Sequence, residues 1–298
     1  LFRYLINCAG VTRQKLISTK SRFLSHSLLI LSKKKCYNRL CAIKEIISKQ
    51  REEVEGNQMD LNTQLKKYAQ LIAKVGLNVQ EGQPVLVRAS TETREFVAKV
   101  VEACYELGAK RVSVEWRDQE LTKLNLKYQS EESLSTVGQW YVDKYQVELD
   151  EGAAFLSIIG DDPDGLAGVD SAKLKASMVG RSKAMRNYMK SIMSDECPWC
   201  VVSASTVGWA KRLYPELNDE EAYLKLWDQI LSACRSTGDD PVAEWEEHIK
   251  VLDEKAKFLH ENELVKLHIT NDLGTDLYVG LPKNHIWQSA GSYAKKAD

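Results

Sequence analysis

The stretch PVLVRASTETREFVAKVVEACYELGAKRVSVEWR, residues 84–117, decides the fold class. It begins with a short apolar strand over 84–90, and proline takes the first position, where it costs the sheet no internal hydrogen bond. A helix with one apolar face follows and ends at Gly108, and residues 110–117 alternate as a second strand. The residues expected to face inward from that strand are Val112, Val114 and Trp116. This order predicts two parallel strands joined by a right-handed crossover.

The same alternation continues on both sides of this unit. A helix with one apolar face over 61–75 precedes it. Further along, a helical region over 130–148 leads to an apolar strand at 153–160, and one long helix over 172–192 leads to a strand at 199–205. Continuously apolar strands are typical of a parallel sheet covered on both faces. The predicted fold class is therefore α/β, a largely parallel sheet flanked by helices.

The pattern changes towards the C-terminus. Helices are expected over 219–234 and 241–262, and the second carries a stripe with 3-4 spacing that predicts docking on a partner element. The stripe consists of Val242, Trp245, Ile249, Leu252, Ala256 and Leu259. After it, LVKLHITN and TDLYVGL are joined by DLG and predict an antiparallel hairpin with an open edge. We therefore divide the chain into an α/β domain, 59–262, and the start of a second domain, 263–298.

Composition and charge exclude some functional classes. The 298 residues are 44% hydrophobic, which is enough for a sizeable core, and the formal net charge is -1. Nucleic-acid and membrane partners usually require a basic excess, so neither is expected. The charge is unevenly distributed: residues 1–58 carry 12 Lys/Arg against 4 Asp/Glu, which leaves 29 against 38 of the totals of 41 and 42 for residues 59–298.

The basic leader, 1–58, is expected to be a disordered segment or a translated upstream region, with the native start at Met59. An organellar presequence is the alternative, since acidic residues are absent before Glu45. The longest apolar stretch of the leader, 23–31, is too short to span a bilayer. Seven cysteines without a convincing secretion signal indicate reduced thiols and a cytoplasmic location.

The loop GDDPDGLAG, residues 160–168, follows an apolar strand and is the candidate ligand loop. Asp161, Asp162 and Asp164 could hold Mg²⁺ at the carboxyl end of that strand, where open α/β sheets bind ligands. Alternatively, the loop is a solvated turn in which each residue has a local backbone role. No glycine-rich phosphate loop accompanies it. A stand-alone ligand-binding module using this loop is therefore the rival function, with Mg²⁺-dependent nucleotide or phosphate binding as its signature.

Cysteine and histidine give no complete catalytic group. CPWC, 197–200, has the spacing of a dithiol redox site or of half a zinc site, but it leads directly into an apolar strand and has no second cysteine pair, so packing is the simpler interpretation. A dithiol oxidoreductase remains a third possibility. After Met59 the histidines are His248, His260, His268 and His285. No HExxH, GxSxG or Cys-His arrangement can be assembled from them.

Several motifs together resemble a known family. They are YAQLIAKVGLNVQEGQPVLVRA from Tyr68, DPDGLAGVD from Asp162, STVGWAKRLYP from Ser205, and GTDLYVGLPKNHIWQSAG from Gly274. None is unique alone, but their order and spacing are similar to those of the aminopeptidase T / aminopeptidase S family of dinuclear-metal exopeptidases. The resemblance covers about Met59 to the C-terminus.

The resemblance implies a cytoplasmic, homodimeric metallo-aminopeptidase that removes N-terminal residues from peptides with the help of two divalent metal ions, zinc or cobalt. The metal ligands of the family lie in a PTEEV-type segment and in later His-containing motifs, and no matching residues occur before Asp298. We therefore expect an inactive N-terminal fragment without catalytic or metal-binding residues of its own and without a bound metal. Asp276 and His285 match family positions, and a hairpin-stabilising aspartate and a packed or rim histidine are the expected roles.

Overall fold

The computed structural model describes residues 60–289 and residue 294. The helices are the stretch 60–71, the π-helical turn η1 (Ile72–Gly76), the 3-10 turn η2 (Thr91–Thr93), α2 (Arg94–Glu106), α3 (Gln119–Tyr128), α4 (Glu131–Ser135), α5 (Gln139–Asp150), α6 (Ser171–Ala184), α7 (Arg186–Met193), α8 (Val207–Leu213), α9 (Asp219–Ala233) and α10 (Pro241–Glu261). The strands are β1 (Pro84–Ser90), β2 (Arg111–Arg117), β3 (Ala154–Ile159), β4 (Trp199–Ser203), β5 (Lys266–Thr270) and β6 (Asp276–Gly280). The expectations for the leader, 1–58, lie outside the described residues.

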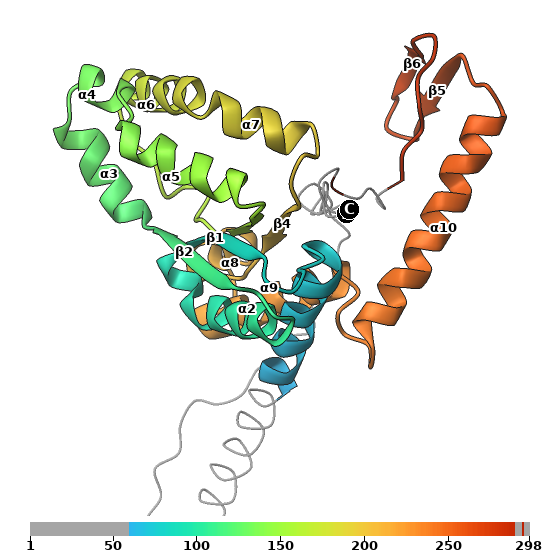
Figure 1. The fold of residues 1–298 in the computed structure, drawn as a ribbon, viewed down its shortest axis with the longest axis horizontal. Coiled ribbons are helices and arrows are strands. Elements are labelled where there is room, and N and C mark those ends of the chain that lie inside the picture. The colour runs from blue at the N-terminus through green and yellow to red at the C-terminus, as the bar shows by residue number, and fades with distance from the viewer. Residues whose placement is uncertain (1–59, 290–293, 295–298) are drawn as a thin grey trace, which may run out of the picture.

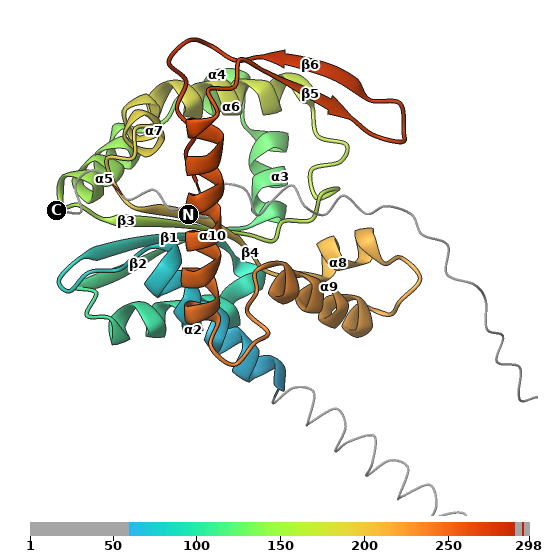
Figure 2. The same ribbon diagram turned by 90° about the vertical axis from the view of Figure 1, so that its right-hand side faces the viewer.

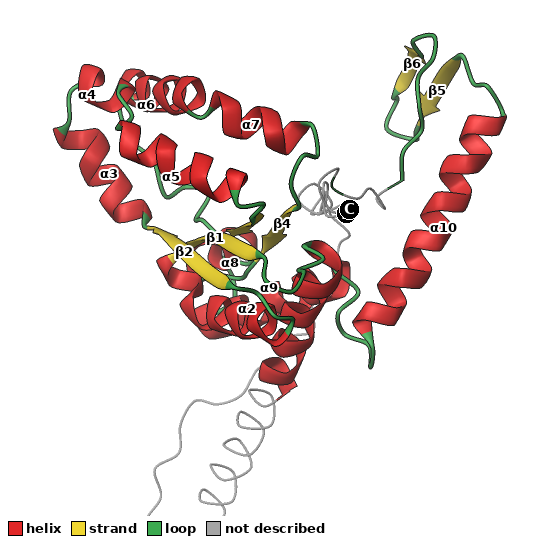
Figure 3. Cartoon of the chain, viewed as in Figure 1, coloured by secondary structure: helices red, strands yellow, loops and turns green. Residues whose placement is uncertain are grey.

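Four parallel strands form the central sheet in the order β2-β1-β3-β4. β1 lies in the middle, where Val85 is in register with Val112 on one side and with Ala154 on the other. Helices cover both faces: α5 and α7 lie on one side of the sheet, and α2 and α9 lie on the other (Figures 1 and 3). The parallel α/β sheet predicted from the sequence is therefore confirmed.

The alternation of side chains along β1 divides the core into two clusters. Val85, Val87 and Ala89 face a large cluster formed with the first helix, α2 and α9, in which Tyr68 and Trp227 are almost completely buried. Leu86 points to the opposite face and joins a smaller cluster with α5 and α7. Since both faces of β1 and β3 are buried, the hydrophobic stabilisation of the fold is concentrated here. We call residues 60–234 the body.

Side-chain caps fix where several helices begin. Asp118 accepts a hydrogen bond from the Leu121 amide at 3.0 Å and starts α3, and Thr206 caps α8. Asn218 and Glu221 form a reciprocal capping box at the start of α9. Asp240 caps α10, and Pro241 takes its first position. α3 and α8 follow the ends of β2 and β4, so their caps also determine how these loops leave the sheet.

Three sequence expectations are corrected. Trp116 is not buried: it is 43% exposed near the end of the edge strand β2, whereas Val112 and Val114 of the same strand pack against the large core cluster. The region 130–148 is not one helix but α4 and α5, and α3 before it and α8 after β4 were not predicted. The expected helix 172–192 breaks at Met185, which ends α6 and starts α7. The break turns Met185 into the smaller core cluster while α6 packs against α4.

The C-terminal part departs from the body as an arm consisting of α10, β5 and β6. Figure 1 and Figure 2 show α10 leading away from the sheet and carrying the hairpin at its far end. β5 and β6 pair as the predicted antiparallel hairpin, and β6 is exposed along its whole length. The chain then returns towards α10, where the Ser289 hydroxyl donates to Asp253. Of the stripe predicted to dock α10, Trp245 is buried and the other five members are half-buried.

Candidate functional site

The carboxyl ends of the four parallel strands meet at one edge of the body. β1 and β3 are neighbours, but their next strands, β2 and β4, lie on opposite sides of them. In open α/β sheets this switch point is where ligands bind, because the two following loops separate there. The loop after β1 is η2, and the loop after β3 is the predicted ligand loop that begins at Gly160.

Side chains fill this switch point. A Cβ atom added to Gly160 would lie 2.7 Å from the Ala204 carbonyl oxygen and 3.2 Å from the Thr93 Cγ2 atom. The Thr206 hydroxyl donates to the Gly160 carbonyl and closes the space from the side of β4. The close approach therefore requires a glycine at position 160, and the methyl groups of Thr93 and Thr206 lie against it at the switch point.

The loop aspartates are largely engaged in holding the loop itself. The Asp162 carboxylate accepts from the Asp164 amide at 2.9 Å, which is the local turn bond typical of aspartate. The side chain of Gln119, from α3, bonds both backbone groups of Asp162, at 2.8 and 3.0 Å. The Asp164 carboxylate pairs with Arg212 of α8 at 2.9 Å. These contacts favour the turn interpretation over the Mg²⁺ site.

The electrostatics of this edge are unfavourable for a further negative charge. Burial raises the pKa of the Glu92 carboxyl, and the nearby carboxylates of Asp161, Asp162 and Asp118 raise it further. Such crowding could attract a cation. Within the described part of the chain, however, no three His, Cys, Asp or Glu side chains come close enough together to hold a metal ion.

The cysteines of CPWC are buried and unsuited to redox exchange. Cys197 precedes β4 and Cys200 lies within it, and both are thiols outside any disulfide, with 3% exposure or less. Burial raises the pKa of the Cys200 thiol far above its ordinary value. A reactive thiol needs a lowered pKa and an exposed position, often at a helix N-terminus. These contacts therefore favour a packing role for Cys197 and Cys200 over a redox role.

The hairpin brings together one histidine and one aspartate of the arm. His268 and Asp276 are diagonal neighbours on β5 and β6, with His268 Nε2 at 2.6 Å from Asp276 Oδ1. The imidazole stacks on Tyr278, its partner in register, with 4.0 Å between ring centroids. His285 lies beyond β6, where its Nδ1 is 2.9 Å from the Pro282 carbonyl oxygen. Two exposed side chains are too few to hold a metal ion. The pair instead links β5 to β6.

A polar row crosses the sheet on the face covered by α5 and α7. Arg88 is in register with Glu115 on β2 and with Ser157 on β3, and its guanidinium donates to the Ser157 hydroxyl at 2.6 Å. The Glu115 carboxylate accepts from Tyr141 at 2.8 Å and from Lys144 at 2.8 Å. Burial opposes its charge, but these hydrogen bonds outweigh burial and lower the pKa of Glu115. The row anchors α5 to the sheet.

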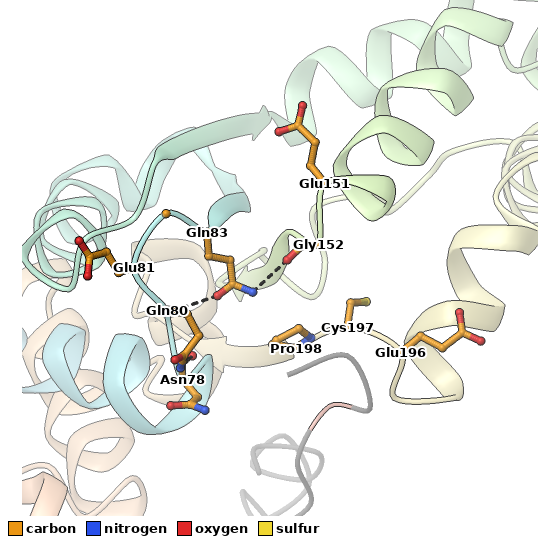
Figure 4. Close-up of a pocket in the computed structure, with 10 residues that line it drawn as sticks. Asn78, Gln80, Glu81, Gln83, Glu151, Gly152, Glu196, Cys197 and Pro198 are labelled. Carbon is orange, nitrogen blue, oxygen red and sulfur yellow. Dashed lines mark hydrogen bonds between the residues drawn. The ribbon is translucent and has the colours of Figure 1, made fainter. Parts of the chain in front are cut away.

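Two hollows lie at opposite ends of the strands, one at the amino ends and one on the carboxyl side, where α3 and the loop after β3 run. The first, of about 340 Å³, is at the amino ends of the strands beside Glu81, Glu151 and Cys197 (Figure 4). Gln83 crosses it, and its amide bonds Gly152 at 2.9 Å and Gln80 at 3.1 Å, so this polar group is already satisfied. The second, of about 410 Å³, lies between α3 and the loop before α6. Its lysines are Lys123, Lys127 and Lys173.

Sequence reasoning missed both hollows and the polar row. Lys123 and Lys127 stand four residues apart, which places them on one face, and this was the available signal. The row depends on which strands are neighbours, and the chain order of β1, β2 and β3 does not reveal that.

The fold and its loops define an α/β protein whose described residues contain no assembled catalytic group, continued by an arm made of α10, β5 and β6. The chain belongs to the thermophilic metalloprotease (M29) family, whose model matches residues 61–298. The resemblance read from its motifs is thereby confirmed.

Known relatives are aminopeptidases. The chain is 40% identical over 228 residues to aminopeptidase AmpS of Bacillus subtilis, covering 76% of this chain and 55% of that protein. It is 35% identical over 231 residues to aminopeptidase T of Thermus thermophilus, covering 78% and 56%. The solved structure described as wild-type AmpT from Thermus thermophilus superposes with a TM-score of 0.73 at 33% identity, covering 80% of this chain and 58% of that one. The chain thus spans about half the length of the curated relatives it matches.

The metal chemistry that the family description implies does not fit the donor set of the described residues. The closest combinations are the loop aspartates, which are engaged with Arg212 and with backbone groups, and the pair of His268 and Asp276. Neither supplies the three or more protein ligands that a catalytic metal site requires. We therefore assign no catalytic step to these residues.

Proposed function

We propose that this chain is the N-terminal part of a metallo-aminopeptidase, a hydrolase that removes N-terminal residues from peptides. The observation that carries the proposal is the match of residues 61–298 to aminopeptidases, at 40% identity to AmpS and with a TM-score of 0.73 to AmpT. Residues 59–262 form the N-terminal domain in this proposal, and residues 263–298 begin the catalytic domain. Two divalent metal ions, zinc or cobalt, belong to the whole protein.

The proposal places the metal ligands beyond Asp298, so that residues 1–298 alone are inactive. It is supported by the length of the matches, which cover 55% of AmpS and 56% of aminopeptidase T. The hairpin supports it in a second way. Two isolated strands are marginally stable in water, and β6 is exposed along its length, which suits a sheet completed by further strands.

The proposal also includes a cytoplasmic homodimer. Cys104, Cys197, Cys200 and Cys234, within the described residues, form no disulfide, as expected for a reducing compartment. In residues 60–289 and 294 no helix is both long enough and apolar enough to cross a bilayer.

Hydrolysis of an aminoacyl p-nitroanilide tests the proposal, with the same compound blocked at its α-amine as the control. A protein of the relatives' full length that contains this chain is expected to cleave the free-amine substrate after loading with zinc or cobalt, to lose the activity with a chelator, and to leave the blocked substrate intact. Failure with both metals overturns the aminopeptidase assignment. Turnover by residues 1–298 alone overturns the placement of the ligands.

A further inference from the structure

We draw no further inference here: the strongest candidate, the hollow between α3 and the loop before α6 that is lined by Lys123, Lys127 and Lys173, carries nothing because the chain spans about half the length of its relatives and nothing in the structure shows what covers this face.

Discussion

The body and the arm are held in different ways. In the body, β1 and β3 are buried on both faces, and Tyr68, Leu71 and Leu231 have no exposed surface. In the arm, every residue of β6 is exposed, and α10 is fully buried at Pro241 and Trp245. Burial of apolar side chains stabilises the body. The arm is stabilised by its helix cap, by strand pairing and by the few contacts of α10 with the body. The same residue change should therefore have unequal effects in the two regions.

The largest expected difference comes from one leucine in each region. Leu231 has no exposed surface and belongs to the large core cluster, whereas Leu273, at the hairpin turn, is 91% exposed. Leu231→Ala is expected to lower the free energy of unfolding by about 2–5 kcal/mol through lost transfer energy and the cavity left behind. Leu273→Ala should change it by less than about 0.5 kcal/mol. Urea denaturation followed by circular dichroism measures both, and equal losses would contradict the comparison.

A smaller difference is expected from a single methyl group added to a glycine. A Cβ on Gly180 would lie 2.2 Å from the Ser135 carbonyl oxygen, where α4 crosses α6, whereas a Cβ on Gly280 meets nothing within 4 Å. Gly180→Ala is expected to destabilise the body by about 1–3 kcal/mol, because the overlap exceeds the gain in helix propensity. Gly280→Ala should be neutral. Urea denaturation measures the free energy of unfolding of both variants. A stabilised Gly180→Ala variant would show that α4 can shift freely.

The sequence was most informative where burial was continuous. The mostly apolar run 84–90 gave the bounds of β1 correctly, although it contains Arg88 and ends at Ser90. It was least informative at Trp116, because an edge strand has the same alternating pattern as a half-buried inner one. The break between α6 and α7 at Met185 could not be predicted, since methionine is common both inside helices and in cores. The closure at Gly160 and the polar row through Arg88 depend on contacts between distant segments.

The polar row should give the body a pH dependence in the acidic range where carboxyl groups titrate. Because hydrogen bonds outweigh burial and lower the pKa of Glu115 below its ordinary value of 4.5, the folded state favours the charged form. This stabilisation is complete above about pH 4.5 and is lost as the pH falls through the lowered folded-state pKa. Glu115→Gln removes the titrating group and should flatten the fall in stability between about pH 5 and pH 3. Thermal unfolding across this range measures the slope.

The control for Glu115 is an exposed carboxylate on the arm. Glu246 lies on the outside of α10. Glu246→Gln is expected to leave the wild-type profile unchanged, because an exposed charge is well solvated in both the folded and the unfolded chain. A profile flattened equally by both substitutions would show that the acid-sensitive groups lie elsewhere.

The smallest effect is expected at the pair of His268 and Asp276, and it tests whether the arm unfolds together with the body. The pair joins β5 to β6 at 2.6 Å but is exposed, so Asp276→Asn should change the global free energy of unfolding by less than about 0.5 kcal/mol. Hydrogen exchange of the amides in 266–280 should nevertheless become about two- to fivefold faster, because these amides exchange through local opening. A global loss of 2 kcal/mol or more would mean that the hairpin transmits its stability through α10 to the sheet. In that case the arm would be part of the cooperative unit despite its exposure, and burial alone would not explain where the folded structure ends.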